Sequence, residues 1–81
     1  MRVRVRLFAA LREAVGRAEV DLDLSEGATA EDAWARLVLA SPELAERRQS
    51  LSASVNRRYS PFDAPLREGD EVVFIPPVSG G

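Results

Sequence analysis

Polar and apolar residues alternate along the first seven positions of the chain, with the two-residue period of a β-strand. The alternation places three apolar side chains on one face and three arginines on the other: Val3, Val5 and Leu7 against Arg2, Arg4 and Arg6. We expect the apolar face to point into a core. The arginine face is either a solvated strand surface or a docking surface for an acidic partner, and the pattern leaves both open.

A helical spacing begins at Phe8, because Phe8, Leu11 and Val15 recur at intervals of three and four residues. Gly16 follows at a position where glycine commonly ends a helix. Residues 18–24 then return to the strand period. They place apolar side chains on one face and acids on the other: Val20, Leu22 and Leu24 against Glu19, Asp21 and Asp23.

The centre of the chain predicts a main helix. Thr29, three residues before Asp32, is typical of a helix N-cap with an acid at the third helical position. The helix should bury one face of four residues: Ala33, Trp34, Leu37 and Val38. Trp34 could instead bind a ligand, but this spacing favours a core position. Pro42 suits the first turn of a second, short helix that ends near Arg47 or Arg48.

Four segments complete the pattern. Residues 51–55 predict a strand, and residues 56–59 predict a turn into an irregular segment with two prolines. Residues 66–70 predict a further turn, and residues 71–75 predict the final strand. This order of elements indicates an α+β fold in which one main helix, with shorter helices, packs on a mixed sheet. We expect a single domain over residues 1–81, with a tail at residues 76–81.

The final strand is apolar on both faces, from Val72 to Ile75. A two-layer domain covers only one face of its sheet with a helix. The strand is therefore either central, with loops over its second face, or it points Val73 and Ile75 outward as part of a partner interface. The tail that follows favours the interface.

The tail has a stiff base and a slim end. Pro76 and Pro77 cannot donate to a strand ladder, so the sheet should stop before them and the chain should leave it extended. Six extended residues reach roughly 20 Å. Gly80 and Gly81 have no Cβ and suit a narrow tunnel. We expect the chain to end at Gly81 with a free carboxylate, which needs an activating step before it can transfer an acyl group.

Composition narrows the chemistry. The chain has no Cys and no His, which removes thiol nucleophiles, histidine bases and the usual zinc sites, so we expect no metal site and no autonomous catalysis. All eleven cationic side chains are arginine, so only the N-terminal amine could accept an acyl group. The net charge of −2 disfavours nucleic acid as a partner. No membrane span or signal peptide is recognisable, and we expect a cytoplasmic protein without a membrane partner.

Several stretches resemble the small, sulfur-carrying subunits of molybdopterin synthase, the molybdopterin converting factor subunit 1 family. They cover Leu7-Phe8-Ala9-Ala10-Leu11-Arg12-Glu13-Ala14-Val15-Gly16, Val55-Asn56, Leu66-Arg67-Glu68-Gly69-Asp70-Glu71-Val72 and Pro76-Pro77-Val78-Ser79-Gly80-Gly81. The resemblance spans the whole chain and implies a β-grasp, ubiquitin-like fold. The diglycine end alone is shared with other sulfur carriers and with ubiquitin-like modifiers.

The resemblance implies a subunit that is not an enzyme on its own but donates sulfur within a sulfurtransferase of molybdenum cofactor biosynthesis. An E1-like enzyme would use ATP to adenylate Gly81, and a sulfur donor protein would convert it to a thiocarboxylate, with Gly80 as spacer. The tail would then enter the large catalytic subunit, within a heterotetramer, to convert precursor Z to molybdopterin. No cofactor would be bound permanently. The expected partner-binding residues are Val73, Ile75, Pro76, Pro77, Val78 and Ser79.

Three alternatives remain open. A sulfur carrier for thiamine synthesis or tRNA thiolation would use the same chemistry at Gly81 with a different acceptor. A ubiquitin-like protein modifier would form isopeptide bonds with lysines of target proteins. A β-grasp binding module with an inert tail would keep its full function after removal of Gly80 and Gly81.

Overall fold

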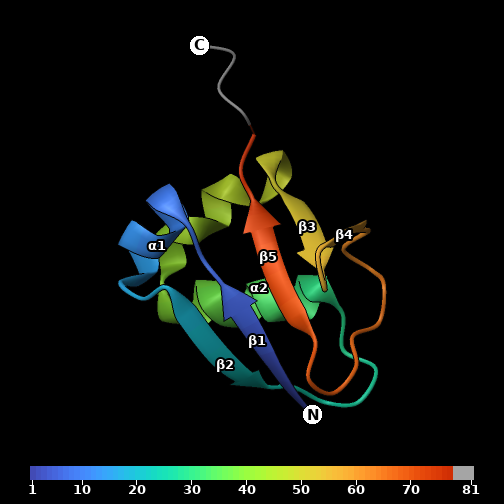
Figure 1. Cartoon of the computed structure of the whole chain (residues 1–81). Coiled ribbons are helices and arrows are strands. Elements are labelled where there is room, and N and C mark those ends of the chain that lie inside the picture. Colours follow the sequence, from blue (N-terminus) through green and yellow to red (C-terminus); the bar gives the residue numbers. More distant parts are fainter. Residues whose placement is uncertain (78–81) are drawn as a thin grey trace.

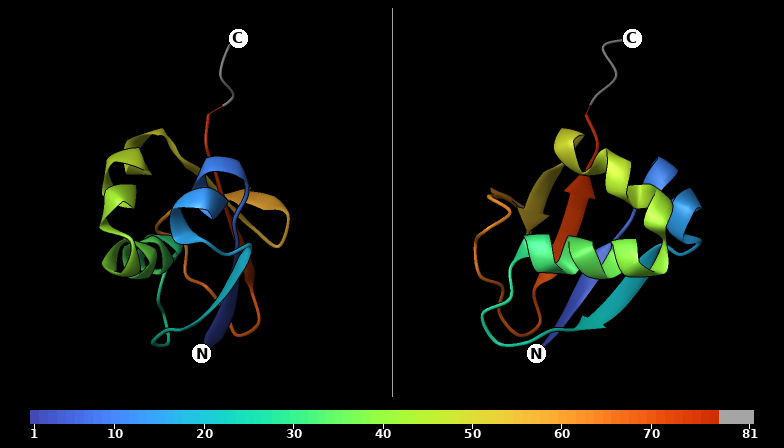
Figure 2. Two further views of the ribbon diagram at one scale, coloured as in Figure 1. Left: turned by 90° about the vertical axis from the view of Figure 1, so that its left-hand side faces the viewer. Right: turned by 180° about the vertical axis from the view of Figure 1, so that it is seen from behind.

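The computed structural model describes residues 1–77 and contains a five-stranded sheet with helices against one face (Figure 1). The elements in chain order are β1 (Arg2–Arg6), α1 (Ala9–Val15), β2 (Glu19–Asp23), α2 (Ala30–Ala40), the 3-10 helix η1 (Pro42–Ser50), β3 (Ser52–Val55), β4 (Arg58–Ser60) and β5 (Glu71–Ile75). Seen from behind, α2 and η1 lie in front of the sheet (Figure 2). This is the predicted α+β arrangement of one main helix and shorter helices on a sheet.

The sheet is mixed and its strand order is β2-β1-β5-β3-β4. β1 and β5 are parallel, with Arg4 opposite Glu71, while the other neighbouring strands pair antiparallel. The last strand of the chain therefore lies in the middle of the sheet. β5 pairs with β1 over Glu71–Val73 and with β3 over Val72–Ile75, so the residue before the tail is still held in the sheet.

The core lies between the sheet and α2. Phe74 of β5 is fully buried, and its ring meets Trp34 of α2 edge-on with 5.1 Å between ring centroids. Phe62 stacks on the Phe74 ring, with 5.8 Å between the ring centroids. Trp34 is only 3% exposed, so the prediction of a core position for this residue is confirmed. The alternation in the first strand is confirmed as well, since Val3 and Val5 are completely buried.

The main helix begins as the sequence predicts. Thr29 is extended, and its hydroxyl accepts a hydrogen bond from the backbone N–H of Asp32 at 3.3 Å. The Asp32 carboxylate accepts in turn from the backbone N–H of Thr29 at 2.8 Å. This reciprocal pair satisfies two backbone donors that a helix N-terminus leaves free.

The segment after β3 differs from the prediction. Residues 56–59 were expected to form a turn that leads into an irregular segment, but residues 58–60 form β4, the second strand of a tight hairpin. The two turn residues, Asn56 and Arg57, have φ of 51° and 71°, the left-handed pair that a two-residue hairpin turn requires. Asn-Gly is the strong sequence signal for such a turn. Because arginine and not glycine stands at the second turn position, the sequence here lacks that signal.

Phe8 also differs from the prediction. Leu11 is buried on the inner face of α1, as the helical spacing indicates. Phe8, however, is extended and precedes the helix, and its side chain is 49% exposed. Ala9, the first helical residue, has φ of 48°, so the backbone turns sharply between the strand and the helix. Phe8 thus continues the arginine face of β1 rather than the apolar face of α1.

Candidate functional site

The candidate site is the end of β5, where the chain leaves the sheet. Ser52 is opposite Ile75, the last residue of the strand. Pro76 and Pro77 follow and have no N–H to donate, so the ladder ends where the sequence predicts. In Figure 1 the described chain leaves at the top of β5, far from Met1 at the bottom. The predicted site residues Val78, Ser79, Gly80 and Gly81 lie outside the described residues.

The outward face of β5 is apolar. Val72 and Phe74 are fully buried beneath the sheet, whereas Val73 and Ile75 are half-buried and point to the other face. This face is turned toward the viewer in Figure 1, away from α2 and η1. The strand is therefore central, and Val73 and Ile75 also point outward. That they form part of a partner interface stays a prediction.

Two aromatic residues that the sequence reasoning missed extend this apolar area. Tyr59 of β4 is 80% exposed and lies opposite Ser54, which is itself opposite Val73. Phe8 follows the end of β1, which runs parallel to β5, so it lies at the same end of the sheet as Ile75. We call Phe8, Tyr59, Val73 and Ile75 the exit surface. Continuing the strand alternation one step past Arg6 would have placed Phe8 on this face.

The charged part of the same face is neutralised by pairing within the sheet. Arg2 contacts Asp23 at 3.2 Å, Arg4 contacts Asp21 at 3.1 Å and Glu19 at 3.8 Å, and Arg6 contacts Glu71 at 3.8 Å. The hydrogen bond from Arg2 lowers the pKa of the Asp23 carboxyl, and the hydrogen bond from Arg4 to Asp21 raises the pKa of Arg4. These pairs favour the solvated strand face over a docking surface for an acidic partner.

The motif residues in the middle of the chain hold the start of β5. The Asn56 side-chain amide donates to a carboxylate oxygen of Asp70 at 2.8 Å, and its oxygen accepts from the backbone N–H of Glu71 at 3.0 Å. The second Asp70 oxygen accepts from the backbone N–H of Arg67 at 2.8 Å. Gly69 has φ of 83°, which completes this turn. These hydrogen bonds join Val55-Asn56 to the 66–72 stretch and fix the end of β5 that lies opposite the tail.

A second structural contact joins η1 to α2 and to the segment before β5. The Arg48 guanidinium binds the Glu31 carboxylate, with its shortest contact at 2.6 Å, and lies 3.4 Å from the centroid of the Phe62 ring. The hydrogen bond from Arg48 lowers the pKa of Glu31. Since Phe62 stacks on Phe74, this contact continues into the core beneath the exit surface.

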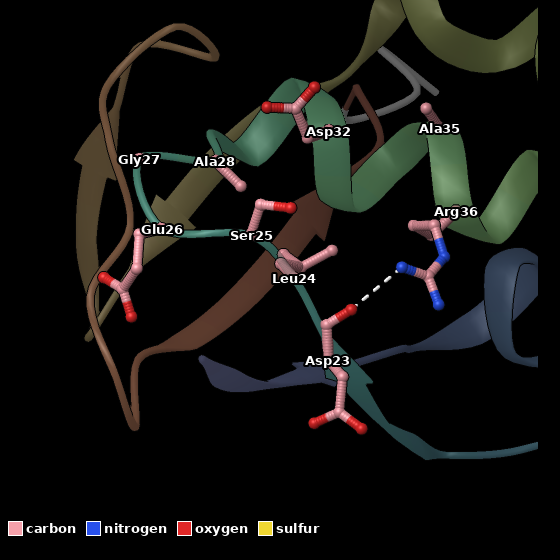
Figure 3. A pocket seen from close by; sticks show the side chains of 9 residues that line it. All are labelled: Asp23, Leu24, Ser25, Glu26, Gly27, Ala28, Asp32, Ala35 and Arg36. Carbon is pink, nitrogen blue, oxygen red and sulfur yellow. Dashed lines mark hydrogen bonds between the residues drawn. The ribbon is translucent and has the colours of Figure 1, made fainter.

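The described residues also form a shallow hollow between β2 and α2 (Figure 3). Arg36 donates to the carbonyl oxygen of Asp23 there at 2.9 Å, and Asp32 is already used in the helix cap. The hollow adjoins Met1 rather than the tail, because Leu24, which lines the hollow, is hydrogen-bonded to Met1. Within residues 1–77, no three or more side chains of the metal-binding types gather into a possible metal site. Nor does that part of the chain include a helix long and apolar enough to cross a membrane.

Comparison with known proteins places this geometry in a family. Residues 5–81 match the family model described as the ThiS family. The chain is 39% identical over 83 residues to the molybdopterin synthase sulfur carrier subunit of Chlamydomonas reinhardtii, and the match covers all of both chains.

Two solved structures show the same fold. The crystal structure of SAMP1 from Haloferax volcanii is 31% identical, covers all of both chains and superposes with a TM-score of 0.88. A protein–protein complex of subunits 1 and 2 of the molybdopterin-converting factor from Helicobacter pylori contains a chain that is 21% identical, with a TM-score of 0.67 and full coverage of both chains. These likenesses, with the strand order, confirm the β-grasp, ubiquitin-like fold.

Proposed function

The chain belongs to the ThiS family, among the sulfur carrier subunits of molybdopterin synthase, and on this premise we propose that Gly81 is the residue that carries the sulfur. The observation that supports this most directly is the full-length match, which runs through the diglycine end. The described structure adds a physical reason, since β5 lies centrally in the sheet and the chain leaves the sheet at Pro76 and Pro77.

The proposed chemistry begins with activation by a partner. A glycine carboxylate is a poor electrophile, so an oxygen of Gly81 attacks the α-phosphate of ATP on an E1-like adenylating enzyme, and pyrophosphate leaves. A sulfur donor protein then delivers sulfur at the oxidation level of hydrogen sulfide. The sulfur attacks the acyl carbon, a C–S bond forms, the acyl–phosphate C–O bond breaks, AMP leaves and the S–H proton passes to solvent. The product is a thiocarboxylate at Gly81, with Gly80 as an unhindered spacer. ATP is thus consumed by the partner, and we place the cycle in the cytoplasm, where ATP is available.

The proposed sulfur acceptor is precursor Z, and the proposed docking partner is the large catalytic subunit of molybdopterin synthase. In this proposal the exit surface docks on that subunit while Pro76, Pro77, Val78 and Ser79 guide Gly81 to precursor Z, which becomes molybdopterin. Two features favour this surface. Its aromatic and branched side chains are exposed or half-buried, and the charges beside it are already paired within the sheet. We propose a heterotetramer with two copies of each subunit. The Helicobacter pylori complex, which joins subunits 1 and 2 in one assembly, is consistent with such a pairing.

A genetic test separates this acceptor from those of other sulfur carriers. Deleting the gene should abolish molybdoenzyme activity in the host strain, and the full chain should restore it. A chain that lacks Gly81 should fold but fail to restore it. Normal molybdoenzyme activity in the deletion strain, with no second carrier gene present, would instead point to thiamine synthesis or tRNA thiolation as the recipient pathway.

A second candidate function is protein modification. It is favoured by the 31% identity and close superposition with SAMP1 of Haloferax volcanii, a small archaeal modifier protein. As a modifier, the chain would link Gly81 to lysine amines of target proteins. Mass spectrometry of trypsin-digested cell extracts decides this point. Trypsin cuts after Arg67, the last basic residue, so target lysines would carry residues 68–81 as a remnant, and these peptides would disappear in the gene deletion strain.

A further inference from the structure

One arginine of β1 lies among the residues of the exit surface. The strand pairings place one residue from each strand in a single row across the outward face of the sheet: Glu19, Arg6, Val73, Ser54 and Tyr59. Arg6 is therefore the direct neighbour of Val73. Its guanidinium also lies 5.8 Å from the centroid of the Phe8 ring. A cation thus lies between two apolar members of the exit surface.

Arg6 is held less tightly than the other two arginines of β1. Arg2 and Arg4 each donate a hydrogen bond to an acid of β2, at 3.2 and 3.1 Å. The acid opposite Arg6 is Glu19, but the Glu19 carboxylate contacts Arg4 instead. In the described part of the chain, the one ion pair of Arg6 is with Glu71 at 3.8 Å, which is too long for a hydrogen bond. The guanidinium N–H groups of Arg6 therefore remain available to a partner.

A protein that covers the exit surface would remove water from these N–H groups. The Arg6 side chain is 43% exposed, so water can satisfy its donors in the free chain. A guanidinium that loses its water without gaining an acceptor weakens binding, and the Glu71 contact is too long to supply one. A carboxylate is the best acceptor, because its two oxygens match two parallel N–H groups of arginine.

We propose that Arg6 determines which partner the exit surface accepts, and that this partner presents an acidic side chain within an apolar surface. Apolar side chains of the partner cover the exit surface, while the carboxylate binds the Arg6 guanidinium. A surface with an apolar group at that place leaves Arg6 without an acceptor, and one with a basic group repels it, so both are rejected. The inference rests on the proposed function, which makes the large subunit of molybdopterin synthase this partner.

The substitution Arg6→Met has opposite effects with and without an acid on the partner. Methionine is an unbranched apolar side chain, so it keeps or raises the affinity of an interface that is purely apolar. If a carboxylate of the large subunit binds Arg6, the same substitution leaves that carboxylate buried without a partner. We therefore expect calorimetric titration with the large subunit to show binding that is weaker by at least about tenfold. Unchanged or tighter binding would overturn the proposal.

Two further variants separate a specific contact from a general effect of charge. Arg2→Met makes the same change on the same strand but outside the exit surface, and should bind nearly as well as the natural chain. Arg6→Lys keeps the charge without the planar pair of donors, and its affinity should lie between those of the natural chain and Arg6→Met. Urea unfolding checks that each variant is folded in the titration. Equal losses for Arg2→Met and Arg6→Met would assign the effect to net charge and overturn the proposal.

A double-mutant cycle identifies the acid on the partner. The acids of the large subunit are replaced one at a time by the corresponding amide, and each variant is titrated with the natural chain and with Arg6→Met. One replacement should weaken the binding of the natural chain without weakening that of Arg6→Met any further. If no acid of the large subunit is coupled to Arg6 in this way, the proposal is wrong.

Phe8→Ala separates a failure of this inference from a failure of the proposed function. If Phe8→Ala weakens binding and Arg6→Met does not, the exit surface still docks on the large subunit and only the inference about Arg6 is wrong. If neither variant weakens binding, the exit surface is not the docking face. That part of the proposed function then fails together with the inference about Arg6.

Discussion

The Asn56 side-chain amide donates to the Asp70 carboxylate at 2.8 Å, across 14 residues of sequence. This contact joins the β3–β4 hairpin to the turn that starts β5, with support from the hydrogen bond between Asn56 and the backbone of Glu71. The two stretches on which the family resemblance rested in this region therefore meet in space. They set the direction of the strand that leads to the tail, although neither motif touches the tail itself.

The first prediction concerns these hydrogen bonds of Asn56. Asn56→Gly keeps the left-handed backbone at no steric cost but removes both side-chain hydrogen bonds. We expect the free energy of unfolding in urea to fall by about 1 kcal/mol, as for exposed hydrogen bonds of this kind. Sulfur loading of the variant under native conditions should remain normal. Loss of loading in a variant that is still fully folded under the loading conditions would show that Asn56 has a role in the chemistry.

The second prediction concerns the neighbouring turn residue. Arg57 has φ of 71°, a conformation that glycine adopts freely and arginine does not. Arg57→Gly should therefore raise the free energy of unfolding by about 0.5–1 kcal/mol. Arg57→Ala removes the same charge without relieving the backbone and should give no such gain. Equal stabilities for the two variants would mean that strain at this position is negligible.

The third prediction concerns pH. The hydrogen bond from Arg48 holds the pKa of Glu31 below its ordinary value of 4.5. The folded state therefore binds a proton at Glu31 less readily than the unfolded chain does. This stabilisation is complete above that ordinary value and is lost as the pH falls through the lower folded value.

The Glu31→Gln variant tests this assignment. Because the pair is partly exposed, we expect the variant to be less stable than the natural chain by only about 0.5 kcal/mol at pH 7. The difference should disappear on acidification below the folded pKa of Glu31. A difference that persists unchanged in strong acid would assign the effect to packing near Phe62 rather than to the ion pair.

The fourth prediction concerns the exit surface. Phe8→Ala should lower the stability of the isolated chain only modestly, because Phe8 is already 49% exposed. It should weaken binding to the large subunit by roughly tenfold, as expected for an aromatic anchor in an interface. Leu39→Ala is the matched control, since Leu39 is 78% exposed on α2, outside the exit surface. Calorimetric titration of both variants should show the loss for Phe8 alone. Equal losses would rule out the exit surface as the docking face.

Much of this fold could be predicted from the sequence where a residue pattern has a single structural solution. The alternation of Val3 and Val5, the cap formed by Thr29 and Asp32, and the end of the sheet before Pro76 are all of this kind. β4 was missed because Arg57 occupies a turn position at which glycine is the usual residue and the usual sequence signal. Phe8 was misplaced because its spacing from Leu11 fits a helix, while the backbone turn at Ala9 breaks that register.

The candidate site was predictable only in part. That Val73 and Ile75 point outward follows from the burial of Phe74, but the neighbours of β5 depend on sheet order, which local patterns do not determine. The arginines of β1 show the same limit. Whether Arg4 is free or paired depends on the acids of β2, and their register became evident only in the sheet.

The central claim is that Gly81 carries the sulfur, and intact-mass spectrometry tests it most directly. The chain is incubated with Mg-ATP, its E1-like adenylating enzyme and a sulfur donor, in parallel with a variant that lacks Gly81. We predict that the natural chain gains the mass difference between sulfur and oxygen and that the shortened chain does not. No gain with an enzyme that performs pyrophosphate exchange on this chain, or an equal gain in the variant without Gly81, would contradict the account.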